Sequence, residues 1–419
     1  MSYARIGSAN TYDNAIRNIS TRQTALSNLQ ENLTSGKRVV RPSDDPTSAA
    51  NAERALTRIS RITSNQRALE SQRNAIAQAE STLGQVTDVL QRFRELVVSA
   101  GDGVHSAAER RSIALELQGL RDQVHALANT ADTNGLPLFS ALGSALAPFV
   151  GPQATAPDYT FNGLPGQAAS SDVAIPFTLD GDAAFMHQPA RDGVYNVTSN
   201  TIPGNRTLTT SGVTVLSSAA VTGDSYQVSI TGVDTTTTPG TTVVGYDITK
   251  LPLPGTSTSF TAPGYATGTP ASIVLDGGAT GLSGLKLTLQ GQPATGDTLT
   301  ITPNPSVFSM LDDAIKDIRE APNNNGATQA VGQALHNIDI GMSRISAVRG
   351  QAGDLLNRAD RISANQENRS IQLESDRSRA EDLDMIKGIS DFNNQQTGYQ
   401  AALQTYAKVQ QLSLFNFIN

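Results

Sequence analysis

The chain has 419 residues, and its 31 lysines and arginines against 38 aspartates and glutamates give a formal net charge of −7. It contains no cysteine, no tryptophan and only four histidines. These counts exclude disulfides, a thiolate nucleophile and a cysteine-ligated metal site, and they argue against a histidine-rich one. The acidic balance and an aromatic content of 5% argue against a nucleic-acid-binding surface.

The start of the chain carries no apolar block followed by a small-residue cleavage site, so we expect no cleaved secretory signal. No window approaches about 18 consecutive apolar residues, and we therefore expect no insertion into a membrane. These features fit either a cytoplasmic protein or one exported by an unusual route.

The first element is an amphipathic helix. Ile16, Ile19, Leu26 and Leu33 recur at helical spacing, and Gly36 suits the position that closes a helix. Isolated helices of this length are marginal in water, so the apolar face needs a partner.

The second element is a long helix with a seven-residue repeat. Asp45 and Pro46 suit the N-cap and the first helical position, so we expect the helix to run from Pro46 to about Ser99. A single regular seam is formed by Ala55, Ile62, Leu69, Ile76, Leu83, Leu90 and Val97. So narrow a stripe favours one partner helix or a small bundle over a globular core.

Ser106 and Glu109 then have the spacing of a capping box that opens another helix. Beyond it the composition changes, because 15 of the 19 prolines lie between Pro148 and Pro305, among many threonines and glycines. Apolar and polar residues alternate at 226–231, 285–290 and 299–302, which predicts half-buried strands.

Helical spacing returns after residue 306, first as a short helix at 307–318 and then as a long one at 331–359. The last helix is marked by Ile389, Phe392, Tyr399, Leu403 and Tyr406 and ends in an apolar run that includes Phe415, Phe417 and Ile418. Like the first helix, it must pair with the other chain end, with further copies or with a different partner. We expect both terminal helices to be disordered in a free monomer.

The predicted fold is therefore α+β and multidomain, with a long, coiled-coil-like helical rod built from both chain ends and an inserted all-β domain. We expect three domains. They are a terminal helical pair (1–45 with 376–419), a helical rod (46–147 with 306–375) and the β domain (148–305).

No constellation of residues indicates catalysis, a cofactor or a metal. Asp44 and Asp45 are adjacent carboxylates, but neighbouring residues do not converge on one substrate atom, and a helix cap explains them better. His105 and Glu109 could face each other, yet two candidate ligands without a third make a poor metal site.

Three stretches resemble the flagellin family of bacterial flagellar axial proteins. The first runs from Leu26 to Pro46 and contains Ser-Gly-Lys-Arg-Val-Val-Arg-Pro-Ser-Asp-Asp-Pro; the others are Ser375–Asp384 and Gln395–Phe415. Filament flagellins usually lack the prolines of the first stretch, Pro42 and Pro46. The resemblance therefore favours the branch of the family found at the junction between hook and filament.

The resemblance implies an exported, non-enzymatic subunit outside the cell, passed unfolded through the flagellar type III apparatus. It implies an inner helical layer made from both chain ends, with an insertion that points outward. The implied partners are further copies in a helical or ring layer, the first hook-associated protein, flagellin and an export chaperone that binds the C-terminal helices. The implied inner-layer residues are Ile16, Ile19, Leu26, Leu33, Leu403, Tyr406, Phe415, Phe417 and Ile418, with Gly36, Asp45 and Pro46 as hinge and cap.

Two other hypotheses remain open from the residues. The chain could be a filament flagellin, present in many copies along the filament. It could also be a surface adhesin whose middle region binds glycans, although no aromatic cluster or calcium loop marks a sugar site.

Overall fold

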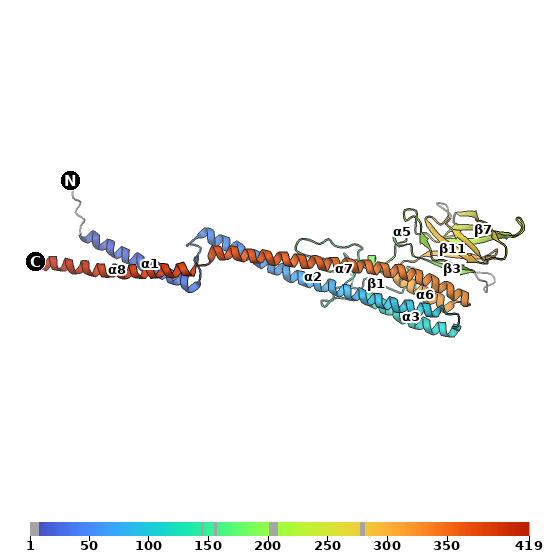
Figure 1. Cartoon of the computed structure of the whole chain (residues 1–419), viewed down its shortest axis with the longest axis horizontal. Helices are drawn as coiled ribbons and strands as arrows, with labels where there is room; N and C mark the ends of the chain where they lie inside the picture. Colours follow the sequence, from blue (N-terminus) through green and yellow to red (C-terminus); the bar gives the residue numbers. More distant parts are fainter. Residues whose placement is uncertain (1–7, 144–145, 155–156, 201–207, 277–280, 419) are drawn as a thin grey trace. The chain divides into compact units, whose positions relative to one another are not determined.

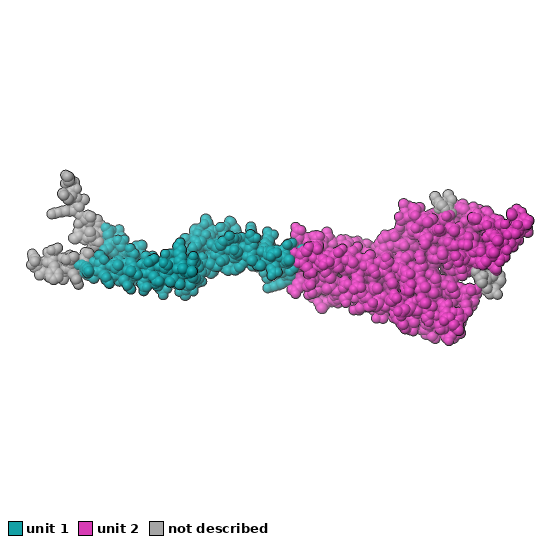
Figure 2. Space-filling model, in the orientation of Figure 1, with its two compact units in different colours: residues 1–68, 362–419 teal, residues 69–361 magenta. Residues whose placement is uncertain are grey.

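A computed structural model of the chain describes residues 8–143, 146–154, 157–200, 208–276 and 281–418, without the side chains of residues 8–12, 409 and 411–418. Its internal contacts divide the chain into two compact units (Figure 2). Unit 1 comprises residues 1–68 and 362–419, and unit 2 comprises residues 69–361. The fold is α+β, as predicted; the division into three domains stays a prediction.

Unit 1 is built from helices of both chain ends. It contains α1 (Ser8–Ser35), the beginning of α2 (Pro46–Ala100), the end of α7 (Asn324–Glu381) and α8 (Met385–Ile418). Helices α1 and α8 lie side by side and run in opposite directions (Figure 1).

Helix α2 begins at Pro46, as predicted. Asp45 caps it, because its Oδ1 accepts hydrogen bonds from the backbone N of Ser48 at 3.1 Å and from the hydroxyl of Thr47 at 2.8 Å. All seven predicted seam residues of α2 are buried. Helix α7 buries a matching seven-residue series, which consists of Val331, Ile338, Ile345, Ala352, Ala359, Gln366 and Leu373.

Within unit 2, ion pairs between α2 and α7 show that the two helices are antiparallel. Arg73 contacts Asp360 at 3.2 Å, and Arg94 contacts Asp339 at 3.0 Å. The predicted coiled-coil-like rod is thus confirmed in its helices and in its seam.

The buried face of α2 is wider in unit 2 than the sequence analysis predicted. Two further rows are buried there, one of Gln72, Ala79, Val86, Phe93 and Ala100 and one of Ala75, Thr82, Val89 and Leu96. Additional helices lie beside α2: α3 (Ala107–Ala128) packs on α6 (Val307–Glu320), and the predicted capping box opens α3 (Figure 1). The unit is therefore a small bundle rather than a two-helix rod.

An aromatic cluster fastens the segment between α3 and the sheets onto the helices. This segment contains β1 (Phe149–Val150), β2 (Thr160–Phe161), α4 (Gly181–Phe185) and α5 (Pro189–Asp192). The ring of Phe308 on α6 lies 5.4 Å from that of Phe149 and 5.7 Å from that of Phe185, between ring centroids. All three rings are fully buried.

Two antiparallel sheets share one apolar core in the rest of the insertion. The larger has the strand order β3 (Tyr195–Asn200), β12 (Thr298–Pro303), β6 (Tyr226–Asp234), β7 (Thr241–Lys250) and β8 (Ser257–Thr261), with β9 (Tyr265–Ala266) also on β7. The smaller joins β10 (Ala271–Leu275), β11 (Leu285–Gly291), β4 (Thr209–Thr210) and β5 (Thr214–Val215). The three predicted alternations are confirmed, because their apolar residues all lie in this core.

Polar side chains of α7 join the helices of unit 2 to the first strand of the larger sheet. Gln333 Nε2 and Asn337 Nδ2 both donate hydrogen bonds to the backbone oxygen of Tyr195, at 2.9 and 3.2 Å. Further along α7, the guanidinium of Arg344 forms an ion pair with the buried carboxylate of Asp192. The insertion is thus held to α7 by directional polar contacts.

Candidate assembly surface

Helices α1 and α8 face each other along a half-buried seam in unit 1. On α1 the seam consists of the half-buried residues Ala15, Ile19, Leu26, Leu29 and Leu33. On α8 the corresponding series is Phe392, Gln395, Tyr399, Ala402 and Tyr406. The α8 series alternates between steps of three and four residues, as in a coiled-coil seam, and the α1 series does so except for a seven-residue step from Ile19 to Leu26.

Two glycines of α8 lie close to side chains of α1. A Cβ atom at Gly388 would lie 3.2 Å from Cδ2 of Leu33, and one at Gly398 would lie 2.6 Å from Nη1 of Arg22. Gly388 thus lies beside Leu33 and Gly398 beside Arg22, so ten residues forward along α8 correspond to eleven residues back along α1. By this register Ile16 and Leu403 lie at the same level of the pair.

The predicted inner-layer residues fall into two groups. Ile19, Leu26, Leu33 and Tyr406 are half-buried and lie in the seam. By contrast, Ile16 and Leu403 remain 46% and 40% exposed. The side chains of Phe415, Phe417 and Ile418 lie outside the described residues. The contribution of these residues to assembly stays a prediction.

The first turns of α8 expose further apolar side chains that the predicted set does not include. Met385, Ile386 and Ile389 are 45%, 85% and 50% exposed. Ile386 and Ile389 are three residues apart and so share one face of the helix. The helical spacing of the sequence already marks Ile389, and a helical-wheel plot that starts after Asp384 would have added Met385 and Ile386. Together with Ile16 and Leu403, we call these five residues the outer apolar set of α1 and α8.

The connectors between the helices cross at one place. Gly36, with φ of +71°, closes α1 as predicted, and its carbonyl oxygen accepts a hydrogen bond from Leu383 N at 2.9 Å. Arg38 N donates to the carbonyl oxygen of Glu381 at 2.7 Å, and Lys37 forms an ion pair with the carboxylate of Glu381. The ends of α1 and α7 are thereby tied together through the backbone.

Charged side chains reinforce this crossing. Arg38 lies 3.3 Å from the carboxylate of Asp45. Hydrogen bonds from Ser48, Thr47 and Arg38 hold the pKa of Asp45 well below its usual range. Arg377 contacts Glu374 at 2.6 Å and Glu381 at 3.1 Å, and the hydrogen bonds that Arg377 donates to Glu374 raise the pKa of Arg377. The predicted hinge and cap residues therefore lie within one network.

Over the part of the chain that the structure describes, no helix combines the length and apolarity needed to cross a membrane. The same residues contain no group of three or more histidines, aspartates or glutamates placed to hold a metal.

Comparison with known proteins places the two chain ends in one family. The sequence profile of the bacterial flagellin N-terminal helical region matches residues 6–143, and that of the C-terminal helical region matches residues 335–418. Flagellar hook-associated protein 3 of Salmonella typhimurium is 36% identical over 154 residues, which is 35% of this chain and 46% of that protein. The Escherichia coli protein of the same name is 38% identical over 141 residues, 33% of this chain and 44% of that protein. The chain thus spans about half the length of the curated relatives it matches.

Solved structures agree on the fold. The flagellar junction protein FlgL from Legionella pneumophila superposes with a TM-score of 0.56 at 24% identity, over 74% of this chain and 98% of that one. FlgL from Xanthomonas campestris gives a TM-score of 0.55 at 24% identity, over 77% and 98%. At this identity the likeness shows the fold alone. With both of its helical ends matched over more than half of its length, the chain belongs to the bacterial flagellin family.

Proposed function

We propose that the chain is a structural, non-enzymatic subunit that joins the hook to the filament of a bacterial flagellum, outside the cell. The curated relatives that it resembles include two proteins named flagellar hook-associated protein 3, at 36% and 38% identity. The observation that carries the proposal is the outer apolar set on a helix pair whose own seam is only half-buried.

Large apolar side chains that stay in contact with water favour a surface that covers them. Each fully buried side chain of this size contributes roughly 1.5–3 kcal/mol, so the five residues together could drive assembly. The covering surfaces would be further copies of the chain within a layer, the first hook-associated protein on one side and flagellin on the other. Before assembly, an export chaperone would cover the C-terminal helices.

Reconstitution tests this proposal directly. The purified chain is added to isolated hooks that carry the first hook-associated protein, and flagellin is added afterwards. We expect filaments to grow only when the chain is present. Failure to support growth, by a chain that is folded by circular dichroism, would refute the proposal.

Matched variants separate the surface from the fold. Ile16→Asp with Leu403→Asp places two charges in the outer apolar set, whereas Ile16→Met with Leu403→Met keeps that set apolar. We expect the first pair to abolish incorporation and the second to retain it. Removal of residues 400–419 should likewise abolish incorporation while unit 2 stays folded.

A second candidate function is that of the filament subunit itself. The Borreliella burgdorferi flagellar filament 41 kDa core protein is 34% identical over 127 residues, 30% of this chain and 38% of that protein. Immunogold labelling of intact flagella distinguishes the two. A junction subunit is labelled at one position, and a filament subunit along the whole length.

A further inference from the structure

Asparagine is followed by glycine at three places in the chain, 134–135, 162–163 and 325–326. Such a pair is chemically labile, because glycine has no side chain that would keep its backbone nitrogen away from the side-chain amide of the asparagine. Two of the pairs begin the same four residues, Asn-Gly-Leu-Pro, at 134–137 and at 162–165. Their local sequence is therefore matched, and a difference in their reactivity in the folded chain would come from the fold.

Hydrogen bonds hold both reacting groups of the pair at Asn134. Its side-chain Nδ2 donates to Oδ2 of Asp132 at 3.2 Å, and the backbone N of Gly135 donates to the backbone oxygen of Asp132 at 3.0 Å. Oδ1 of Asp132 also accepts hydrogen bonds from the backbone N of Asn134 and from that of Leu136, both at 2.8 Å. Attack by the nitrogen of Gly135 would break hydrogen bonds that stabilise this turn.

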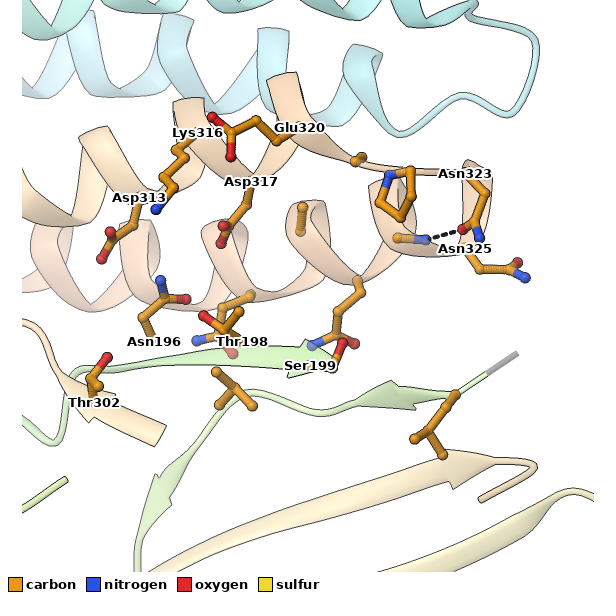
Figure 3. Close-up of a pocket in the computed structure, with 18 residues that line it drawn as sticks. Asn196, Thr198, Ser199, Thr302, Asp313, Lys316, Asp317, Glu320, Asn323 and Asn325 are labelled. Atoms are coloured by element: carbon orange, nitrogen blue, oxygen red, sulfur yellow. Dashed lines mark hydrogen bonds between the residues drawn. The ribbon is translucent and has the colours of Figure 1, made fainter. Parts of the chain in front are cut away.

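The pair at Asn325 is held by the first turn of α7. Asn325 lies on the wall of a polar pocket of about 500 Å³, which is also lined by residues of α6, β3 and β12 (Figure 3). The backbone N of Gly326 donates a hydrogen bond to Oδ1 of Asn323 at 2.8 Å (Figure 3). This nitrogen is thus occupied, and α7 would have to unwind at its start before it could attack the side chain of Asn325.

The pair at Asn162 has neither kind of protection. It follows β2 and lies outside the helices and strands. Among the described residues, neither the side-chain amide of Asn162 nor the backbone N of Gly163 has a hydrogen-bond partner. Asn162 and Asn134 are both exposed, so the two matched pairs differ in hydrogen bonding and not in access to water.

Packing requires glycine at position 163. A Cβ atom there would overlap the ring of Phe161 and would lie 2.7 Å from the backbone oxygen of Ser140. A larger residue would therefore force Phe161 or the backbone of Ser140 to move. The fold thus keeps the least protective neighbour directly after Asn162.

We propose that Asn162 is a modification site at which the folded protein deamidates spontaneously. The backbone N of Gly163 forms a bond to Cγ of Asn162, and the side-chain nitrogen leaves as ammonia with the proton that the nitrogen of Gly163 gives up. The product is a five-membered succinimide ring. A water molecule opens this ring at one of its two carbonyl carbons. One opening gives aspartate, and the other gives isoaspartate, in which the main chain continues through the former side chain.

Isoaspartate would lengthen the backbone by one methylene group between two anchored points. The backbone N of Asn162 donates to the oxygen of Pro148 at 2.8 Å, and the oxygen of Leu164 accepts a hydrogen bond from the backbone N of Leu142 at 3.0 Å. We expect the added group to weaken both hydrogen bonds, because their spacing along the chain changes. Both products also add a negative charge to a chain whose net charge is already −7.

Peptide mapping by mass spectrometry follows the three sites in one sample of the full chain during incubation in mildly alkaline buffer. A methyltransferase specific for isoaspartate identifies that product. We expect Asn162 to lose its amide about tenfold faster than Asn134 or more, because two hydrogen bonds of ordinary strength correspond to about that factor in rate. Asn325 should also react more slowly than Asn162. In concentrated urea the two Asn-Gly-Leu-Pro sites should react at equal rates, because the hydrogen bonds are then absent.

Variants, each verified to be folded by circular dichroism, test the cause. Asn162→Gln should remove the isoaspartate signal of the folded chain, because glutamine would have to close a larger ring. Asp132→Ala should bring the rate at Asn134 toward that at Asn162, because the side chain of Asn134 loses its hydrogen-bond acceptor. The proposal is overturned if Asn162 keeps its amide in the folded chain, if Asn134 reacts as fast as Asn162 there, or if their difference persists in urea.

Discussion

The buried imidazole of His187 sets an acid limit to the stability of unit 2. His187 is 6% exposed and lies in the segment between α4 and α5, and neither ring nitrogen has a hydrogen-bond partner among the described residues. Burial lowers the pKa of His187 to about 4; the carboxylate of Asp192 opposes this shift, and the guanidinium of Arg344 adds to it.

The pKa of His187 is about 6.5 in the unfolded chain and about 4 in the folded one. Between these two values the unfolded chain binds a proton that the folded chain does not, so the free energy of unfolding falls as the pH falls. At about 1.4 kcal/mol per pKa unit, the loss across the window is about 3 kcal/mol. The stabilisation is complete above about pH 6.5 and gone below about pH 4.

His187→Leu removes the proton-binding group at nearly constant volume, and because the ring makes no hydrogen bond, we expect little change in stability at about pH 8. Between about pH 6.5 and about pH 4, we expect the free energy of unfolding of the variant to fall by about 3 kcal/mol less than that of the parent chain. Urea unfolding followed by tyrosine emission measures this, since the chain has no tryptophan. His105→Gln, at a loop position, is the matched control. An unchanged pH dependence in His187→Leu would refute the reasoning.

Three further predictions concern the free energy of unfolding of unit 2. Arg344→Met should lower it by about 3 kcal/mol, because the carboxylate of Asp192, which is 2% exposed, would lose a partner inside the protein. Leu83→Ala should lower it by about 2–5 kcal/mol, because this seam residue is fully buried and leaves a cavity. Ser106→Ala should lower it by about 1 kcal/mol through loss of the α3 cap. Urea denaturation measures all three.

Each of these predictions has its own control. Arg344→Met with Asp192→Asn should recover most of the loss, and no recovery would mean that packing rather than charge dominates at this pair. The control for Leu83→Ala is Leu115→Ala on the exposed face of α3, which should hardly change the free energy of unfolding. A loss as large as that of Leu83→Ala would contradict the cavity argument. Ser106→Thr should keep the cap, so a full loss in that variant would rule capping out.

The helices of the rod could be predicted because their signals are local. The seven-residue spacing from Ala55 to Val97 and the Asp45–Pro46 pair depend only on helix geometry, and the structure confirms both. The burial of the two additional rows of α2, which include Val86 and Phe93, could not be predicted from residue spacing alone. Their burial depends on segments that reach α2 only through tertiary packing: Arg92 contacts Glu116 of α3 at 3.4 Å, and the backbone N of Ile175 donates a hydrogen bond to Oε1 of Gln72 at 3.1 Å.

The candidate sites show the same limit. The sequence indicated that Ile16 and Ile19 lie on an apolar face of the first helix, but one is exposed and the other half-buried in the seam. That division depends on how α8, which lies hundreds of residues away in the sequence, packs on α1. The pairs at Asn134 and Asn162 begin the same four residues, and only the fold makes their hydrogen bonds differ.

The crossing in unit 1 has two connectors of unequal length. Ten residues join α1 to α2, from Gly36 to Asp45, whereas only three join α7 to α8, from Asp382 to Asp384. Backbone hydrogen bonds from Leu383 to Gly36 and from Arg38 to Glu381 hold the two connectors against each other. The longer connector includes a turn in which Oδ2 of Asp44 accepts a hydrogen bond from the backbone N of Arg41 at 2.8 Å. The shorter connector has only three residues. Insertions and deletions should therefore accumulate in the longer connector during evolution, while the shorter one keeps its length.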